Sequence, residues 1–428
     1  MIKLLRQFLA DSKELLYTPP SDKNVRGMAM IVTVFAILGV SIGIPFTGDS
    51  SYYVVLIIGT LFLIYRGGFK ISAPFIAFYF IIILNILVID IPPFFKPLQR
   101  VLLFILLTLT CTSAMETSVA AKFRAYLFRY IAFGMIILSV GSFFCFFLGI
   151  NLMIPEKIAE AYGGYQARGG WFGGLTTHSM MLGPISMISA LVFYFLYQKG
   201  SRKLYLLLFF LSAMSAVFAA SRSALLGLVV AIVYNLLFGK VNSKMRKRMI
   251  SILAISAILT IPIAGVAFKG LINKQESRNA QSSSLNTRQG KFDSRIEEFK
   301  SSPIFGVGFC AVDLDSGDCE PSEGRIEPGT SHLSVLSMTG LAGFVVYLII
   351  LYKAYHNTKI IKNLHSRFVF ACFIAFFVHA WFEGYIFAAG GFLALVYWLV
   401  IGQCIDCNKI SKIMSSSAIR QQNNKYLR

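Results

Sequence analysis

Twelve apolar stretches, separated by short polar connectors, constrain this chain of 428 residues more than any other feature. Most of them are close to the roughly 20 residues that a helix needs to cross a bilayer core. The second, fourth, eighth and twelfth are shorter and would need local thinning of the bilayer. The stretches are 28–45, 52–65, 71–91, 101–115, 126–150, 179–197, 204–220, 225–238, 250–268, 334–352, 368–387 and 391–405. The sequence therefore predicts an all-α integral membrane protein with about twelve transmembrane helices.

Basic residues fall mostly on alternate connectors, and this pattern predicts the orientation of the chain. Lys and Arg gather at 3–26, 66–70, 122–124, 199–203, 240–248 and 353–367 and in the C-terminal tail. By the positive-inside rule these segments and both termini are cytoplasmic. The net charge of +20 is then explained by anionic membrane lipid, so no nucleic-acid partner is expected. With 56% hydrophobic residues and a mean hydropathy of +0.68, a soluble globular fold is excluded.

Most connectors between the apolar stretches are short, but two outer segments are long. Together with the polar ends of the chain, the apolar stretches and these segments define five parts. Residues 1–27 form a cytoplasmic amphipathic segment without a cleavable signal peptide, in which 2–16 read as an interfacial helix. Residues 28–268 hold the first nine transmembrane helices, with an outer loop at 151–178. Residues 269–333 form a large outer loop with a short helix that Pro303 ends. Residues 334–405 hold the last three transmembrane helices, and 406–428 form a basic cytoplasmic tail.

Four arginines lie on the outer side, where the orientation of the chain does not require positive charge. Arg168 stands in a glycine-rich segment, Arg222 lies at the mouth before the eighth stretch, and Arg288 and Arg295 share one face of the loop helix. Guanidinium groups bind phosphate bidentately and keep their charge at membrane depth, so this set suits a diphosphate that carries a lipid tail. The alternative is that each arginine snorkels to the interface or pairs with a carboxylate.

His332 directly precedes the tenth stretch, and at the outer membrane face it could act as a general base towards a sugar hydroxyl. The alternative is a purely structural histidine. His178 is similarly placed but a weaker candidate, whereas His365 is interpreted as a solvated loop residue. Glu383 lies one turn after His379 in the eleventh stretch, and an intramembrane carboxylate is a functional candidate. Alternatively, Glu383 accepts a hydrogen bond from His379 or pairs with an arginine.

Two of the seven cysteines, Cys310 and Cys319, lie in the large outer loop. If the outer compartment is oxidising, they form a disulfide that holds the turn before His332; if not, they remain thiols. No metal site is expected. Asp313 and Asp315 form a DxD pair, but the segment does not fit a calcium loop, and the CxxC at Cys404 has no second pair.

The outer residues together resemble the O-antigen ligase and polymerase family. The resemblance rests on Arg288 and Phe292 upstream of the segment 302–308, Ser-Pro-Ile-Phe-Gly-Val-Gly, followed by His332. Arg222 within 221–227 is similar to the family's outer-mouth arginine. Glu383 resembles the acidic residue that the family carries late in its membrane region. Arg168, which precedes two glycines, is similar to the arginine of the family's first outer loop. The matching motifs cover roughly residues 160–390.

The resemblance implies an inverting glycosyltransferase of the bacterial inner membrane that needs no metal or other cofactor and whose active site faces the periplasm. The donor would be a glycan on undecaprenyl diphosphate, held by Arg222, Arg288 and Arg168, with His332 as the base. The acceptor would be a second lipid-linked glycan for a polymerase, or a lipid A core sugar for a ligase. The alternative is a transporter or flippase of the same lipid-linked glycan, which would place polar residues along several membrane helices.

Overall fold

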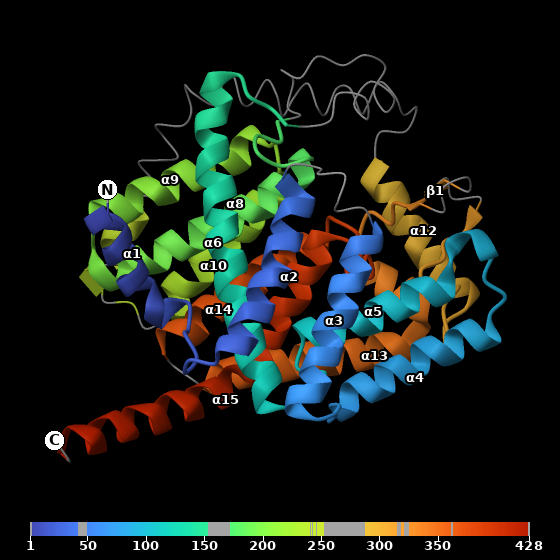
Figure 1. Cartoon of the computed structure of the whole chain (residues 1–428). Helices are drawn as coiled ribbons and strands as arrows, with labels where there is room; N and C mark the ends of the chain where they lie inside the picture. The colour runs from blue at the N-terminus through green and yellow to red at the C-terminus, as the bar shows by residue number, and fades with distance from the viewer. Residues whose placement is uncertain are drawn as a thin grey trace.

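The structure is a computed structural model, and it forms a bundle of α-helices with one small hairpin (Figure 1). It describes residues 2–41, 49–152, 172–239, 241, 243–244, 246–251, 287–314, 318–320, 325–360 and 363–426. The elements are α1 (Ile2–Leu15), α2 (Lys23–Ser41), α3 (Asp49–Gly67), α4 (Ala73–Val88), η2 (Pro93–Phe95), α5 (Pro97–Cys111), α6 (Ser118–Leu148), α8 (Ser179–Gly200), α9 (Lys203–Phe218), α10 (Arg222–Phe238), α12 (Thr287–Ser301), β1 (Cys319–Glu320), β2 (Arg325–Ile326), α13 (Ser331–Ile360), α14 (Leu364–Ala380) and α15 (Phe392–Tyr426).

Eleven of the twelve predicted apolar stretches coincide with helices of the bundle, and the ninth, 250–268, lies largely outside the described residues. Among the described residues, six helices are long and apolar enough to cross a membrane, namely α2, η2 with α5, α6, α8, α13 and the first part of α15. Five shorter apolar helices accompany them. The all-helical membrane architecture is therefore confirmed, while the number of spans stays a prediction.

The bundle has buried central helices and outer helices that expose apolar side chains on one face. In α8 and in the first part of α15, residues 392–411, nearly all apolar side chains are buried, as expected for helices that are hydrophobic on every side. By contrast, α3, α4, α10 and α13 keep large apolar side chains exposed, for example Leu61 at 60% and Leu87 at 77%. Contiguous exposed apolar surface of this kind suits contact with lipid tails rather than water.

Contacts between connectors divide the bundle into two ends. At the basic end, the connectors before α4 and α6 meet in a β-bridge between Ile71 and Met115, and Lys353 pairs with Glu116 at 3.1 Å. At the outer end, the α2 carbonyl of Val40 accepts from Thr177, and Arg100 reaches the Cys310 carbonyl. These two sets are the connectors predicted to lie on opposite sides of the membrane.

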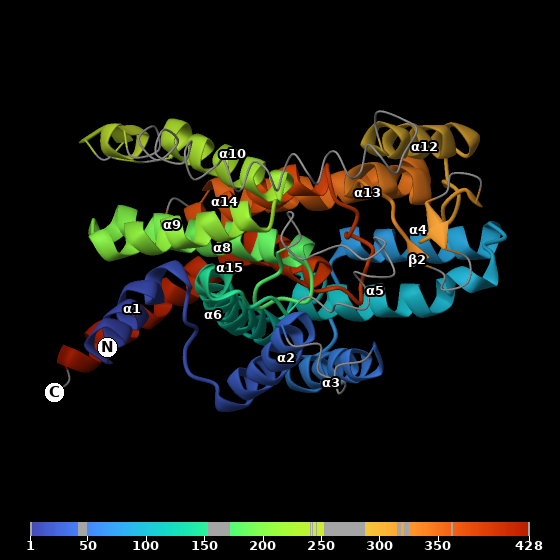
Figure 2. The same cartoon turned by 90° about the horizontal axis from the view of Figure 1, so that it is seen from above.

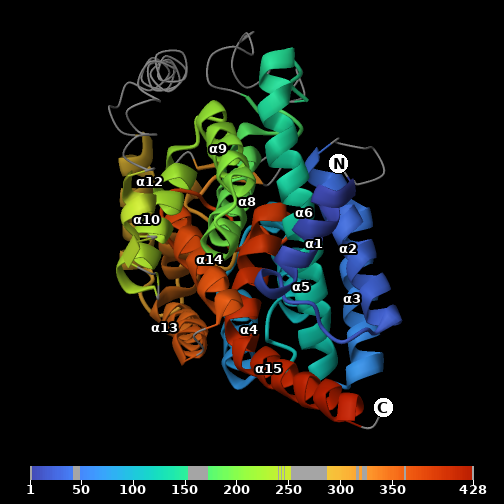
Figure 3. The same cartoon turned by 90° about the vertical axis from the view of Figure 1, so that its left-hand side faces the viewer.

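Helix α1 packs on α8 and α14, on the side of the molecule that faces the viewer in Figure 3. Phe8 contacts Phe133 and Phe193, and Leu15 is fully buried, so the apolar face of this amphipathic helix meets protein. His365 is also buried and hydrogen-bonds the Leu15 carbonyl at 2.8 Å. The interpretation of His365 as a solvated residue is therefore wrong, because α1 covers it.

A buried ion pair joins α6 to α15 inside the bundle. The guanidinium of Arg124 contacts Asp406 at 2.7 Å, and both side chains are fully buried. Ser113 donates to the second carboxylate oxygen at 2.7 Å. Because breaking such a pair leaves an uncompensated buried charge, it fixes how α15 sits against its neighbours.

Helix α13 is broken at Gly340, whose φ of +62° belongs to the left-handed region. The segment 302–309 packs into this break. The Leu341 N–H donates to the Pro303 carbonyl and the Val307 N–H to the Ser337 carbonyl, both at 2.8 Å. A broken membrane helix requires such partners, because lipid offers none to the freed backbone groups.

Glycine is required on both sides of this junction. A Cβ on Gly340 would lie 2.2 Å from the Ile304 carbonyl oxygen, and one on Gly306 would lie 2.3 Å from that of Ser337. Asn85, buried in α4, completes the junction by donating to the Phe305 carbonyl and accepting from the Phe309 N–H at 2.6 Å. The Pro-x-x-Gly-x-Gly pattern thus holds the outer loop against α4 and α13.

Candidate functional site

The outer end carries the candidate site, beginning with the N-terminus of α10. Arg222 is the first residue of this helix and is exposed, and Ala220 before it has a left-handed φ of 51°. The next residue, Ser223, donates to the Glu383 carboxylate at 3.4 Å. The turn into α10 therefore brings the segment that carries Arg222 beside Glu383. A helix N-terminus also favours bound negative charge through its free N–H groups.

The apolar stretch 368–387 predicted that Glu383 lies inside a helix, but in the structure it lies after the helix ends. Helix α14 ends at Ala380, and Glu383 stands in the turn-rich connector that leads to α15. His379 bonds the hydroxyl of Tyr385 at 3.1 Å. The glycines of this connector favour turns over a continued helix, so the expected position of Glu383 within the eleventh helix is wrong.

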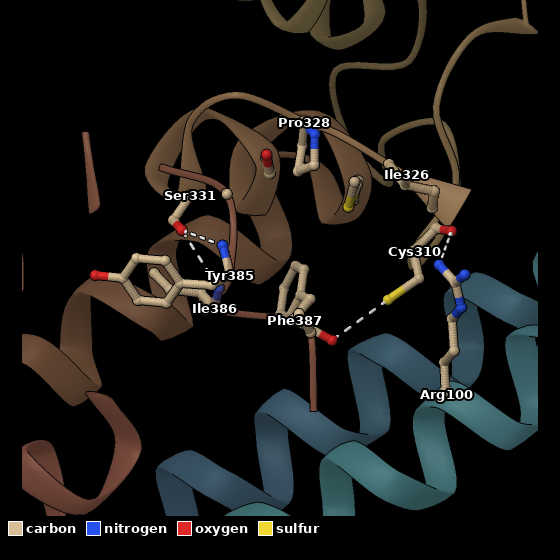
Figure 4. A pocket seen from close by; sticks show the side chains of 12 residues that line it. Arg100, Cys310, Ile326, Pro328, Ser331, Tyr385, Ile386 and Phe387 are labelled. Carbon is tan, nitrogen blue, oxygen red and sulfur yellow. Dashed lines mark hydrogen bonds between the residues drawn. The ribbon is translucent and has the colours of Figure 1, made fainter. Parts of the chain in front are cut away.

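The connector after α14 is fixed to the start of α13. Ser331 donates to the Glu383 carbonyl at 2.6 Å. It also accepts from the Tyr385 N–H at 2.8 Å (Figure 4). A Cβ on Gly384 would lie 2.4 Å from the Pro328 ring, so the backbone at Gly384 packs directly against that ring. The residue beside His332 thereby sets the backbone position of Glu383.

His332 is buried, with 3% of its surface exposed. Its Nε2 lies 2.9 Å from the Phe377 carbonyl, which can only accept, so the proton is on Nε2 and Nδ1 holds the lone pair. The Tyr347 hydroxyl, 3.0 Å from Nδ1, is then the donor, and it lies 2.5 Å from the Tyr397 hydroxyl. Both ring nitrogens are thus engaged, and the ring ties α13 to α14 and, through the two tyrosines, to α15.

Helix α12 lies along α13, as the view from above shows (Figure 2). It carries Arg288, whose side chain lies outside what the structure describes. Three residues later, Lys291 reaches the Glu327 carbonyl at 2.8 Å and its carboxylate at 3.2 Å. Lys291 also packs against Gly329. The segment 327–331 is therefore held between α12 on one side and the connector of Glu383 on the other.

Arg295 has a different environment from the other arginines of the outer side. It is fully buried and pairs with Glu298 at 2.7 Å and Asp318 at 3.0 Å. Burial lowers the pKa of Arg295 and raises that of Glu298, and the attraction between them opposes both shifts. Arg295 thus joins α12 to the β1–β2 hairpin, as the alternative of pairing with a carboxylate anticipated.

Cys310 and Cys319 are free thiols in the structure, so the proposed disulfide is not formed. The Cys310 sulfur points to the Phe387 carbonyl, 3.9 Å away (Figure 4). Cys319 pairs with Ile326 in the hairpin. Burial raises the pKa of Cys310 to about 12, so its thiol stays protonated. The segment before His332 is held instead by Lys291 and Ser331.

A small cavity of about 70 Å³ lies beneath these segments and is lined by Arg100, Cys310, Ser331 and Tyr385, among others (Figure 4). It has room for a few water molecules but not for a diphosphate or a sugar. Within the part of the chain that the structure describes, no group of three or more His, Cys, Asp or Glu residues could hold a metal ion.

The structure brings together some of the expected residues and adds others. Arg222, Glu383 and His332 lie on adjoining segments, whereas Arg168 lies outside the described residues. His178 caps α8 by accepting from the Met180 N–H at 3.0 Å. The sequence reasoning missed Lys291, although its position between Arg288 and Arg295 on the same helix gave the signal.

A comparison with known protein families finds a match that covers part of the region around the candidate site. Residues 207–351 match the family model described as O-antigen ligase, so this part of the chain is similar to that family. The match spans most of α9, all of α10 and α12, and most of α13. It includes Arg222, Arg288 and His332 but ends before Glu383. No curated protein matches the chain.

Proposed function

We propose that this chain, part of which is similar to the O-antigen ligase family, is a membrane glycosyltransferase that moves a glycan from undecaprenyl diphosphate to a sugar hydroxyl. The observation that carries the proposal is the meeting of the α10 N-terminus, the Glu383 connector and the segment 327–331 at the outer end. This region places Arg222, on the part of the chain that matches the family, on a segment beside the Glu383 carboxylate, which lies after that part. The acceptor would be lipid A core or a second lipid-linked glycan.

In the proposed reaction, the acceptor oxygen attacks the anomeric carbon of the donor from the side opposite the diphosphate. The bond from that carbon to the diphosphate oxygen breaks, and the leaving diphosphate takes the electron pair. Arg222 and the α10 N-terminus would stabilise its developing charge, together with Arg288 and Arg168. The transfer would invert the anomeric configuration without a metal ion, in the inner membrane with the site facing the periplasm.

The base that takes the acceptor proton is either His332 or Glu383. For His332 to act, the Tyr347 hydroxyl must first leave Nδ1, and the buried ring must become accessible. Glu383 is partly exposed and lies beside the α10 turn, so its carboxylate needs no such rearrangement. We therefore propose Glu383 as the second candidate beside His332, with His332 then acting by holding α13 against α14.

A set of variants separates these two roles. Loss of a true general base lowers the rate by about 10²- to 10⁴-fold. If His332 is the base, His332→Gln should show that loss while Glu383→Gln keeps most of the activity, and the reverse holds if Glu383 is the base. Tyr347→Phe is the matched control, because it removes the hydroxyl from Nδ1 and keeps the ring. Transfer would be measured as the surface glycan ladder at equal protein level, with and without chelator. If both variants keep a near-normal ladder, neither residue is the base.

The diphosphate role is tested at Arg222. Arg222→Ala should abolish transfer while the protein stays in the membrane, and Arg222→Lys should restore only part of it, because a point charge cannot reproduce the bidentate fork. Lys300, exposed on α12 at the same end, offers a control in Lys300→Ala, which should keep full activity. Full rescue by lysine would mean that only net charge matters, and unchanged activity in Arg222→Ala would overturn the proposed function.

A further inference from the structure

A second and larger pocket, of about 570 Å³, lies far from the candidate site, at the basic end of the bundle. Its lining comes from the last turns of α10, the second half of α13 and the first turns of α14. α10 and α13 both pack on α14, so α14 forms the floor and the other two helices form the walls. The volume is in the range of ligand pockets, roughly 300–1,000 Å³.

The inner part of this pocket is aromatic. Phe370 on the floor contacts Tyr234 of α10, with ring centroids 5.3 Å apart, and Tyr355 of α13, at 5.8 Å. At the rim of the pocket, Phe238 is exposed and lies beside Tyr234, with tilted rings whose centroids are 5.0 Å apart. These rings line a surface that suits hydrocarbon, and their hydroxyl groups offer polar contacts at its edge.

The pocket also holds two cationic side chains. Arg367 lies one turn before Phe370 on α14 and donates to the amide oxygens of Gln198 and Asn235, at 3.0 and 3.2 Å. Lys359 on α13 is exposed and donates to the Tyr355 hydroxyl at 2.9 Å. No carboxylate is among the described residues that line the pocket. Its electrostatic character therefore favours an anion.

The outer surfaces of both walls carry exposed apolar side chains, which suit contact with lipid tails. On α10, Val233 and Leu237 are exposed at 44% and 61%, and on α13, Ile349 and Tyr352 are exposed at 47% and 64%. A ligand that reaches the pocket from between these helices comes from the bilayer. It would have an anionic head for Arg367 and Lys359 and an apolar tail for the aromatic wall.

We propose that this pocket binds an anionic phospholipid, with its phosphate at Arg367 and Lys359 and its chains along Phe370 and Phe238. Basic pockets between transmembrane helices at the cytoplasmic side recognise anionic head groups in this way. The site is independent of the proposed glycan transfer. Its occupant would brace α10 against α14 at the end opposite to Arg222.

The test uses the full purified chain in neutral detergent, titrated with short-chain phosphatidylglycerol, short-chain phosphatidylcholine or inorganic phosphate, with bound lipid counted by native mass spectrometry. The wild type should bind one phosphatidylglycerol at least about tenfold more tightly than phosphatidylcholine, and millimolar phosphate should not displace it. Because one basic residue contributes about a fivefold factor, Lys359→Gln should weaken phosphatidylglycerol binding by about that amount. Lys359→Gln with Arg367→Gln should remove the preference for it.

Two exposed basic residues of the same end, Lys13 and Lys203, provide the matched control, because Lys13→Gln with Lys203→Gln removes the same charge away from the pocket. This variant should bind within about twofold of the wild type. Lys359 is exposed, so the single variant is not expected to disturb folding. Equal loss in the control, equal binding of the two lipids, or displacement by phosphate would overturn the proposal. The last result would mean that the pocket binds small anions.

Discussion

At the scale of single residues, position in the fold separates arginines that the sequence alone could not rank. Arg222 is exposed at a helix start beside the Glu383 connector, whereas Arg295 is fully buried between two carboxylates. Both carry the same charge on the outer side of the chain. Burial and pairing are tertiary properties, so the sequence could place both residues in the outer region but could not assign a ligand to one and a structural role to the other.

Arg295→Ala should destabilise the outer loop, because it leaves Glu298 buried without its cation and leaves Asp318 with Lys291 alone, at 3.6 Å. Removing one member of a buried ion pair costs about 3–5 kcal/mol. The measurement is the midpoint of thermal unfolding together with protease cleavage within 287–330. Glu297→Ala, an exposed neighbour on the same helix, is the control and should change neither. If Arg295→Ala weakens donor binding at unchanged stability, Arg295 contacts the ligand.

At the scale of elements, the break in α13 explains a motif that the sequence could recognise only by its family resemblance. The segment 302–309 supplies backbone hydrogen-bonding groups to the break at Gly340. The side-chain amide of Asn85 in α4 donates to a carbonyl on each side of the junction, those of Phe305 and Met338. Eleven apolar stretches predicted their helices, because apolar composition and length suffice for that. The break was not predictable, because the apolar stretch 334–352 continues through Gly340 and the partner segment lies thirty residues upstream. Asn85, a polar residue inside an apolar stretch, was the signal that was missed.

Gly340→Ala should lower the free energy of unfolding by at least about 2 kcal/mol. The substitution combines a left-handed backbone, which costs roughly 1–3 kcal/mol, with a Cβ 2.2 Å from the Ile304 carbonyl oxygen. Gly27→Ala is the control, since nothing lies within 4 Å of its added Cβ. Being inside helix α2, that change should be neutral or stabilising. Thermal unfolding of both proteins checks the prediction. Equal stability of Gly340→Ala and wild type would mean that the break is not required.

At the scale of the whole molecule, the connectors gather at two ends, and the basic residues that predicted the orientation lie at one of them. The pair of Arg124 and Asp406 escaped the sequence reasoning because each residue lies just beyond an apolar stretch, 126–150 and 391–405. Helices α6 and α15 extend past these stretches and bring both charges inside the bundle. Hydropathy locates apolar segments but does not show which charged flanks become buried together.

Labelling from outside intact cells should reach one end only. A cysteine in place of Lys300, exposed on α12, should react with a membrane-impermeant maleimide in whole cells. A cysteine in place of Lys203, exposed at the start of α9, should react only after permeabilisation, because the positive-inside rule places it in the cytoplasm. The reverse pattern would place the candidate site on the cytoplasmic side and remove the proposed donor from its reach.

Arg124→Ala and Asp406→Ala should each destabilise the bundle by about 3–5 kcal/mol, since each leaves its partner charged and buried. Replacing both, as Arg124→Met with Asp406→Leu, should recover most of this loss. Thermal unfolding in detergent gives the comparison, and exposed Lys13→Ala serves as the control. A double variant that is as unstable as the sum of the single ones would show that the two charges act independently.

The pairing of Arg124 with Asp406 also bears on how the chain is made. The two residues are separated by 282 positions, so α6 leaves the ribosome long before α15 does. During synthesis α6 therefore carries a guanidinium without its carboxylate partner until α15 arrives. The ion pair between the two helices can form only after α15 has been made. We expect a nascent chain that is stopped before α15 to leave this charge unpaired and to be degraded faster by membrane quality-control proteases than a chain that includes α15.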